Sequence, residues 1–264
     1  LEDFQGIKHV VIGDLQNQTI IWGHGWGQDH TSFSNLSNVV GGEYAKIMVD
    51  FPGFGASEKP STPQGTRQYA DAIAELIKEK STSPVIWVGH SFGCRVGLQL
   101  AASYPELIAG LFLIAGAGIP KQLPLYKSLY FKGRIMIYKF LKKLIPLGLS
   151  QDWLIKKFGS ADYQNADPVM RQTLVKVVNE DLRDIAEDII CPVTLIYGEK
   201  DTETPPQIGE KLSSHIDNSR LIVLKGQDHY SVLNNGHHQV AHYLKKFILS
   251  LDSTQKTIQV KGAA

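Results

Sequence analysis

One short stretch constrains the fold more than any other: a buried strand that turns into a helix within a few residues. The run Val85–Val88 is apolar on both faces, and a helical pattern follows over Phe92–Tyr104. Between them stands Gly89-His90-Ser91-Phe92-Gly93. The pattern G-x-S-x-G in this position is typical of a nucleophile elbow, which holds the serine in a strained backbone conformation. We therefore expect the Ser91 hydroxyl at the amino end of a helix, where the helix dipole favours negative charge.

The rest of the chain alternates predicted strands with predicted helices, which indicates an α/β sheet. Short runs rich in apolar and β-branched residues predict strands at Thr19–Gly23, Ala45–Asp50, Pro84–Gly89, Leu107–Ala115, Pro192–Gly198 and Arg220–Leu224. Helical spacing predicts helices at Thr66–Lys80, Phe92–Tyr104 and Gln239–Leu251, with Thr66 as an N-cap. Several strands are apolar on both faces, as in a parallel sheet covered on both sides. Ile7–Asp14 and Thr19–Gly23, around the turn Gly13-Asp14, are compatible with a hairpin at the sheet edge.

One long segment interrupts this alternation. Residues 116–191 number 76 and contain no convincing strand. Residues 117–160 carry nine bases and one acid, whereas residues 161–190 carry seven acids and three bases. We interpret residues 117–189 as a dipolar insertion into a core formed by residues 1–116 and 190–264.

Composition excludes several classes of protein. A net charge of +1 offers no overall attraction to nucleic acid. The longest strongly apolar run, Leu107–Pro120, has 14 residues, too few to span a bilayer. The chain opens on Leu1-Glu2-Asp3 without a basic or apolar leader, so we expect a cytoplasmic protein. Cys94 and Cys191 are far apart and are interpreted as buried free thiols.

The sequence predicts neither a cofactor nor a metal site. Gly53-Phe54-Gly55 follows a strand, but the third glycine and the helix of a dinucleotide site are missing. His238 and His242 have a spacing that suits a metal, yet no glutamate or cysteine accompanies them. We interpret both as surface histidines.

A serine nucleophile needs a base, and the base needs a carboxylate that orients it. In proteins with this elbow the partners follow in the order Ser, Asp, His, in loops after late strands. Asp201 stands just past the strand Pro192–Gly198, and His229 follows the strand Arg220–Leu224. The predicted triad is therefore Ser91, Asp201 and His229. Three further acids in these loops are interpreted as solvated charges: Glu199, Glu203 and Asp228.

An acyl-transfer site also needs two N–H donors for the oxyanion that develops. One is expected from the backbone of Phe92, directly after the nucleophile. The other is expected from the early loop His24-Gly25-Trp26-Gly27, at Trp26. His24 itself is interpreted as a buried structural histidine.

Taken together, these motifs resemble those of the α/β-hydrolase superfamily. The matching stretches are HGWG (24–27), DFPGFGASEKP (50–60), GHSFG (89–93), GEKD (198–201) and GQDH (226–229). The resemblance covers nearly the whole chain outside the insertion. It implies a mostly parallel eight-stranded sheet with helices on both faces, a helical cap inserted after strand six, and the same triad. Dehalogenases and epoxide hydrolases of this fold carry Asp at the elbow, so Ser91 argues against both.

The basic half of the insertion has the pattern of an amphipathic helix. Apolar residues recur at helical spacing through Tyr126–Ile145 with lysines between them. Gly133 is expected to divide this stretch into two helices, and Pro146 is expected to end it. One interpretation is a cap helix with a solvated basic face. Contact with an anionic lipid surface or an acidic acyl-carrier protein stays open as an alternative. An apolar substrate pocket is predicted from Trp26, Phe92, Trp153, Phe158 and the cap aliphatics.

The leading functional prediction is a serine hydrolase that cleaves small carboxylic esters of apolar acyl or aromatic groups through an acyl-enzyme. A thioesterase or a carrier-protein methyl-esterase is an enzyme alternative, since the HGWG loop and basic cap are similar to those of pimeloyl-carrier methyl-esterases. Carbon–carbon bond hydrolases of meta-cleavage products share the triad. A ligand-binding receptor without catalysis, on the same fold, is an alternative of a different class. The oligomeric state is left open.

Overall fold

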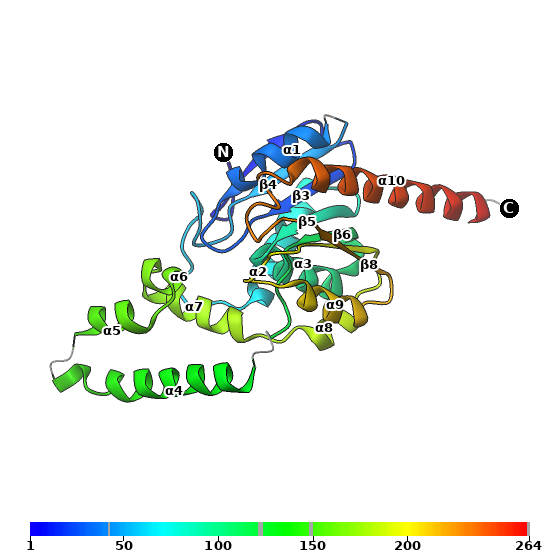
Figure 1. Cartoon of the computed structure of the whole chain (residues 1–264). Helices are drawn as coiled ribbons and strands as arrows, with labels where there is room; N and C mark the ends of the chain where they lie inside the picture. Colours follow the sequence, from blue (N-terminus) through cyan, green and yellow to red (C-terminus); the bar gives the residue numbers. More distant parts are fainter. Residues whose placement is uncertain (42, 121–123, 148–149, 263–264) are drawn as a thin grey trace.

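A twisted sheet with helices on both sides organises the chain (Figure 1). The computed structural model describes residues 1–41, 43–120, 124–147 and 150–262, except for the side chains of 127–128, 147 and 253–262. The strands are β1 (Glu2–Phe4), β2 (Ile7–Ile12), β3 (Thr19–Gly23), β4 (Ala45–Val49), β5 (Val85–His90), β6 (Ile108–Ile114), β7 (Val193–Gly198) and β8 (Ser219–Leu224). Six of them match the predicted strands to within one residue at each end.

The strands lie in the order β1-β2-β4-β3-β5-β6-β7-β8. Strands β4, β3, β5, β6, β7 and β8 are parallel to one another, whereas β2 pairs antiparallel with both β4 and β1. The predicted mostly parallel eight-stranded sheet is confirmed. Because β5, β6, β7 and β8 run in parallel, the loops after them meet at one edge of the sheet.

The predicted hairpin between Ile7–Asp14 and Thr19–Gly23 is wrong. Strand β2 pairs with β4, where His9 lies opposite Val49, and with β1. The turn that joins β1 to β2 is Gln5-Gly6, with φ of 51° and 83°, the conformation of a tight hairpin turn. Every residue of β3 is buried, so β3 lies inside the sheet between two parallel neighbours.

Each face of the sheet buries its own apolar cluster. One face is covered by α2 (Thr66–Lys80), α3 (Phe92–Ser103) and α9 (Pro206–Ser214). The other is covered by α1 (Ser34–Val40) and α10 (His237–Gly262). Short 3₁₀ turns occupy His30–Phe33, Pro105–Leu107 and Ile145–Leu147. Cys94 and Cys191 are buried free thiols, as predicted.

Within the described residues, five α-helices lie between β6 and β7, where the cap was expected: α4 (Leu125–Lys142), α5 (Gln151–Phe158), α6 (Ala161–Asn165), α7 (Pro168–Asn179) and α8 (Arg183–Glu187). Helices α7 and α8 contribute buried side chains to the core, whereas α4 lies at the outer margin (Figure 1). Gly133 does not divide α4. The domain limits at 117 and 189 stay a prediction.

The segment after α7 also completes helix α2. The predicted N-cap, Thr66, is the first helical residue, and Gly65 precedes it in extended conformation. The Glu180 carboxylate accepts hydrogen bonds from the backbone N–H and the hydroxyl of Thr66. A side chain 114 positions away in the sequence thus satisfies an N–H group that the helix leaves without a partner.

Candidate active site

Ser91 is placed by the reversal from β5 into α3. Its φ of 48° lies in the left-handed region, which is strained for a residue with a side chain. The reversal is tight because two backbones approach closely there. A Cβ on Gly89 would lie 2.6 Å from the carbonyl oxygen of Gly93, so only glycine fits. The Gly93 N–H in turn donates to the His24 carbonyl oxygen at 3.0 Å, which joins the elbow to the loop after β3.

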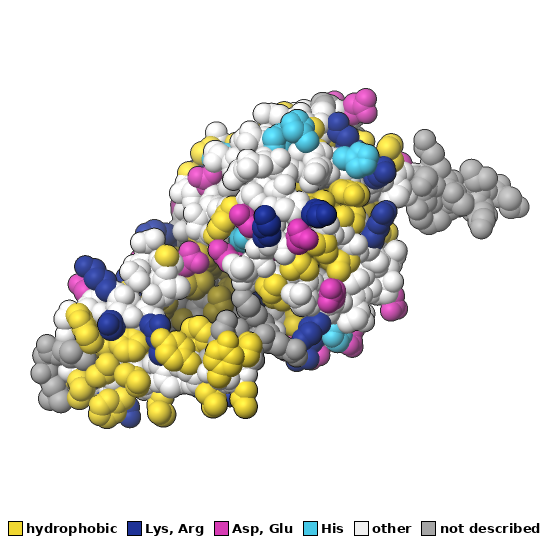
Figure 2. All heavy atoms as spheres, viewed as in Figure 1, with side chains coloured by type: hydrophobic (Ala, Val, Ile, Leu, Met, Phe, Trp, Pro, Cys, Tyr) yellow, Lys and Arg dark blue, Asp and Glu magenta, His cyan; other side chains and the backbone are white. Residues whose placement is uncertain are grey.

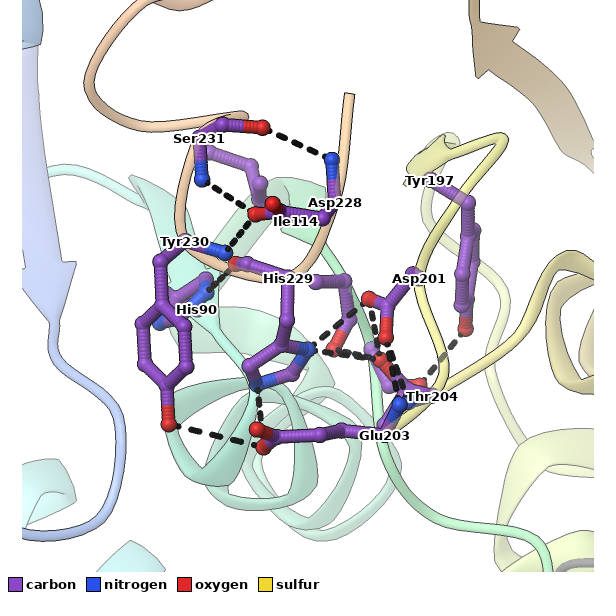
Figure 3. Close-up of polar contacts among 12 residues, drawn as sticks. His90, Ile114, Tyr197, Asp201, Glu203, Thr204, Asp228, His229, Tyr230 and Ser231 are labelled. Carbon is purple, nitrogen blue, oxygen red and sulfur yellow. Dashed lines mark hydrogen bonds and ion pairs between the residues drawn. The ribbon is translucent and has the colours of Figure 1, made fainter. Parts of the chain in front are cut away.

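Asp201 and His229 meet across the loops that follow β7 and β8 (Figure 3). The Nδ1–H of His229 donates to Asp201 Oδ2 at 2.8 Å, and both side chains are buried. Asp201 also accepts the backbone N–H groups of Glu203 and Thr204, each at 2.8 Å. Burial by itself raises the pKa of Asp201, but the hydrogen bonds from His229 and Thr204 outweigh it, so the pKa lies below the ordinary value of 3.8. Asp201 is therefore held as a carboxylate.

Thr204 is a part of this arrangement that the sequence analysis missed. Its buried hydroxyl lies 2.9 Å from Asp201 Oδ2, 3.0 Å from the Ala115 carbonyl oxygen and 3.1 Å from His229 Nδ1. The one available signal was the spacing of Asp201 and Thr204, typical of a side chain that bonds to the backbone two or three residues on. Thr204 thus helps to hold both the Asp201 carboxylate and the His229 ring in place.

The three competing acids have different partners. The Asp228 carboxylate accepts the N–H groups of Tyr230 and Ser231 in its own turn. Glu199 accepts the N–H of Gly226 at 2.9 Å. Glu203 lies on the far side of the imidazole, with Oε2 at 3.6 Å from His229 Nε2 and 3.5 Å from the Tyr230 hydroxyl (Figure 3). Asp201 is thus the acid that bonds to Nδ1, and Glu203 faces the opposite nitrogen.

The structure does not join Ser91 to His229 by a hydrogen bond among the described residues. It does bring their segments together through His90, the residue before Ser91. His90 Nε2 lies 3.0 Å from the His229 carbonyl oxygen, and Nδ1 lies 3.2 Å from Gln28 Oε1. Gln28 in turn accepts the N–H of Gly25. One buried ring therefore connects the elbow, the histidine loop and the loop after β3.

His24 is buried and both of its ring nitrogens form hydrogen bonds, in agreement with its interpretation as a structural histidine. Nδ1–H donates to the Gly25 carbonyl oxygen at 2.7 Å, and Nε2 accepts the Phe51 N–H at 3.0 Å. Burial lowers the pKa of His24 to about 4 and that of His90 to about 3, so both rings are neutral at pH 7. Neutral rings at these positions add no charge to the site.

The two expected oxyanion donors lie beside the elbow. Within the described part of the chain, neither the Phe92 N–H nor the Trp26 N–H has an acceptor. The rings of Trp26 and Phe92 meet edge to face, with centroids 5.5 Å apart, and Phe54 contacts both. The loop after β3 and the elbow are thus packed together, and the backbone N–H groups of Trp26 and Phe92 are left without an acceptor among the described residues.

Comparison with known proteins settles the family. A sequence model described as the alpha/beta hydrolase fold matches residues 18–236. The chain belongs to the α/β-hydrolase family. A pimeloyl-[acyl-carrier protein] methyl ester esterase from Neisseria meningitidis serogroup C is 28% identical over 229 residues, which cover 80% of this chain and 86% of the relative.

Solved structures share the fold of this α/β-hydrolase. A thermophilic esterase from Thermogutta terrifontis superposes with a TM-score of 0.69 at 19% identity, covering 93% of both chains. An esterase from Exiguobacterium antarcticum gives a TM-score of 0.70 at 21% identity, covering 92% of this chain and 95% of that chain. Esterases are thus among both the sequence relatives and the structural neighbours of this hydrolase.

In this α/β-hydrolase the structure brings two of the residues predicted for the pocket into contact. Trp26 and Phe92 are in contact, as described above. Trp153 lies on α5 with 49% of its surface exposed, and no ring contact joins it to Trp26 or Phe92 among the described residues. Its place in the pocket stays a prediction. In the described residues no group of histidine, cysteine and acidic side chains is arranged to hold a metal, and no helix is long and apolar enough to cross a membrane.

Proposed function

We propose that this α/β-hydrolase is a serine esterase, which cleaves carboxylic esters of apolar acyl or aromatic groups. The observation that carries the proposal is the buried Asp201–His229 pair in the loops after β7 and β8, at the same edge of the sheet as Ser91 on its strained strand-to-helix turn. A carboxylate, an imidazole and a hydroxyl in this order are the parts of a nucleophilic hydrolase.

In the proposed reaction Ser91 Oγ attacks the ester carbonyl carbon while His229 Nε2 takes the hydroxyl proton. Asp201 holds the ring through Nδ1 and stabilises its cationic form. The N–H groups of Trp26 and Phe92 donate to the oxyanion. His229 then gives its proton to the leaving alcohol, and a water molecule repeats the sequence on the acyl-enzyme to release the acid and restore Ser91.

The acyl side of the proposed site is apolar. The rings of Trp26, Phe54 and Phe92 pack beside the expected oxyanion donors. Phe54 and Phe92 are buried, whereas Trp26 is partly exposed, so an apolar acyl or aryl group that covers the Trp26 ring gains about 25 cal/mol per Å² of apolar surface removed from water. This supports an apolar acyl or aromatic ester over a strongly polar one.

A second candidate is a methyl-esterase that acts on an acyl group bound to a carrier protein. The observation that favours it is the 28% identity to a relative with that activity, over most of both chains. The reaction is the same ester hydrolysis at Ser91, with methanol as the leaving alcohol. The two candidates differ only in what carries the acyl group.

A panel of substrates tests both candidates. It contains p-nitrophenyl esters of increasing acyl length, acyl thioesters, a dienoate for carbon–carbon cleavage, and a methyl ester tested free and attached to an acyl-carrier protein. The first candidate predicts turnover of free esters that improves with an apolar acyl group. A strict requirement for the carrier selects the second candidate. Turnover of none of them, with binding intact, would favour a ligand-binding role.

A further inference from the structure

Helix α4 exposes its apolar face instead of burying it. Amphipathic helices in proteins normally owe their stability to packing of that face. Helix α4 has 18 residues, and none of its described side chains is buried. Figure 2 shows the result as a continuous band of hydrophobic side chains along the outer margin of the molecule, where Figure 1 places α4.

Most of the exposed apolar side chains of α4 form one stripe, whereas Phe131 and Ile135 are exposed on the opposite side of the helix. At about 100° per residue, seven large apolar residues of α4 fall within an arc of about 140°. Their exposed fractions range from 50% to 77%: Leu125, Tyr126, Leu129, Tyr130, Met136, Ile137 and Phe140. Apolar surface gathered in this way marks an interaction site. We call these seven residues the α4 stripe.

Cations border the α4 stripe. Lys132 and Lys139 follow one edge of the stripe on the helical wheel, and Arg134 lies at the other. Helix α4 contains no acidic residue, and Lys142 and Lys143 continue the positive charge at its end. Among the described residues, none of these five side chains forms an ion pair with a carboxylate. Lys121 and the side chain of Lys127, which belong to the same basic segment, lie outside the described residues.

We propose that the α4 stripe and its bordering cations dock this protein on an anionic lipid surface. An apolar stripe with lysines and arginines along its borders is the pattern of a helix that lies in the plane of a membrane surface. The apolar side chains enter the acyl boundary while the long basic side chains reach the headgroups. The Tyr126 and Tyr130 rings suit this boundary because each has an apolar body and a polar tip.

Charge and shape disfavour the other partners. In a twofold contact between two copies the same patch meets itself, so the bordering lysines would face lysines. An acidic protein would satisfy the cations, but it needs a complementary groove for seven protruding apolar side chains. A lipid surface accepts them without a preformed groove. Docking leaves the hydrophobic hollow beside α4, visible in Figure 2, next to the lipid.

Vesicle binding tests the docking independently of catalysis. Full-length protein in a Ser91→Ala background is mixed with vesicles of phosphatidylglycerol and phosphatidylcholine, or of phosphatidylcholine alone, and the bound fraction is measured by sedimentation. We expect binding to the anionic vesicles that weakens with salt, because the Debye length shortens. Failure to bind anionic vesicles better than neutral ones would overturn the proposal and leave the proposed esterase untouched.

Two pairs of variants locate the contact. Leu129→Ser with Phe140→Ser should reduce binding by at least about tenfold, since each side chain loses its apolar burial. Lys132→Gln with Lys139→Gln should reduce it by about 30-fold at low salt, because each lysine near an anionic surface contributes about 1 kcal/mol. The matched controls are Ile190→Ser with Leu249→Ser, which are exposed aliphatics elsewhere, and Lys245→Gln with Lys246→Gln on α10.

The controls should bind as the parent does, and thermal melts of all variants should match. Equal binding by the α4 variants and their controls would overturn the assignment to α4. Light scattering tests whether a second copy covers the α4 stripe. If the parent protein is a dimer that does not bind vesicles, and Leu129→Ser with Phe140→Ser dissociates this dimer, the stripe is a contact between two copies. Binding to an acidic carrier protein but not to vesicles would likewise overturn the lipid proposal.

Discussion

At the residue scale, two aspartates in neighbouring loops differ in what they bond to. Asp201 is buried and accepts a hydrogen bond from His229 Nδ1 at 2.8 Å. Asp228 adjoins His229 in sequence, but among the described residues its carboxylate accepts the backbone N–H groups of Tyr230 and Ser231 and no hydrogen bond from the imidazole. Distance in sequence is thus a poor guide to which carboxylate orients the ring.

We predict that Asp201→Asn lowers kcat by about 10⁴, because the amide no longer fixes the ring in the productive tautomer. Asp228→Asn removes a nearby carboxylate that makes no hydrogen bond to Nδ1, and it should change kcat by less than about tenfold. Steady-state kinetics on one p-nitrophenyl ester compare the two. A larger loss for Asp228→Asn would reassign the acid.

Some of the site was readable from residues and some was not. The elbow and the order Ser91, Asp201, His229 follow from local pattern, since each residue stands in the turn or loop that follows a strand. Glu203 was interpreted as a solvated charge, yet it faces His229 Nε2, because the turn after Asp201 folds back over the ring. Such a turn depends on three-dimensional packing between two loops, which a local pattern does not encode.

At the element scale, the strands were predictable because burial on both faces leaves a continuous apolar run. Their neighbours were not. Strand β3 follows β2 in the sequence, yet β2 pairs with β4 near the edge of the sheet. Which strands pair depends on long-range packing among several apolar strands. Here β3 is buried on both faces, and it therefore lies inside the sheet and not at its edge. The cap of α2 is long-range in the same way, since Glu180 supplies it.

We predict that Glu180→Ala lowers the free energy of unfolding by about 1–2 kcal/mol, the usual cost of a lost helix cap. The melting temperature should fall by about 3–6 °C for a chain of this size. Glu79→Ala, at the exposed opposite end of the same helix, is the control and should have little effect. If both variants melt together, Glu180 does not stabilise α2.

At the scale of the whole molecule, two neutral histidines make stability depend on pH. Burial lowers the pKa of His24 from 6.5 to about 4, and that of His90 to about 3. The unfolded chain therefore binds more protons than the folded protein below pH 6.5. Stability must fall as the pH decreases from 6.5 toward these folded values.

We predict that His24 alone costs about 2 kcal/mol of stability between pH 7 and pH 5, since each unit of pKa shift corresponds to 1.36 kcal/mol. In His24→Gln the loss of stability between pH 7 and pH 5 should be smaller by that amount, whatever the stability of this variant at pH 7. Denaturant unfolding at both pH values measures it, with His238→Gln on the surface as the control. An unchanged slope in His24→Gln would contradict the neutral, buried state of this ring.

The most direct test of the proposed chemistry is the hydrolytic rate of Ser91→Ala. We predict a loss of kcat on the order of 10⁴ or more, because only the oxyanion donors and substrate binding remain. The variant should keep its fold, checked by its melting temperature, since Ala at this turn removes a hydroxyl that makes no hydrogen bond among the described residues. A Ser91→Ala protein that retains a tenth of the wild-type turnover would contradict the assignment of Ser91 as the nucleophile.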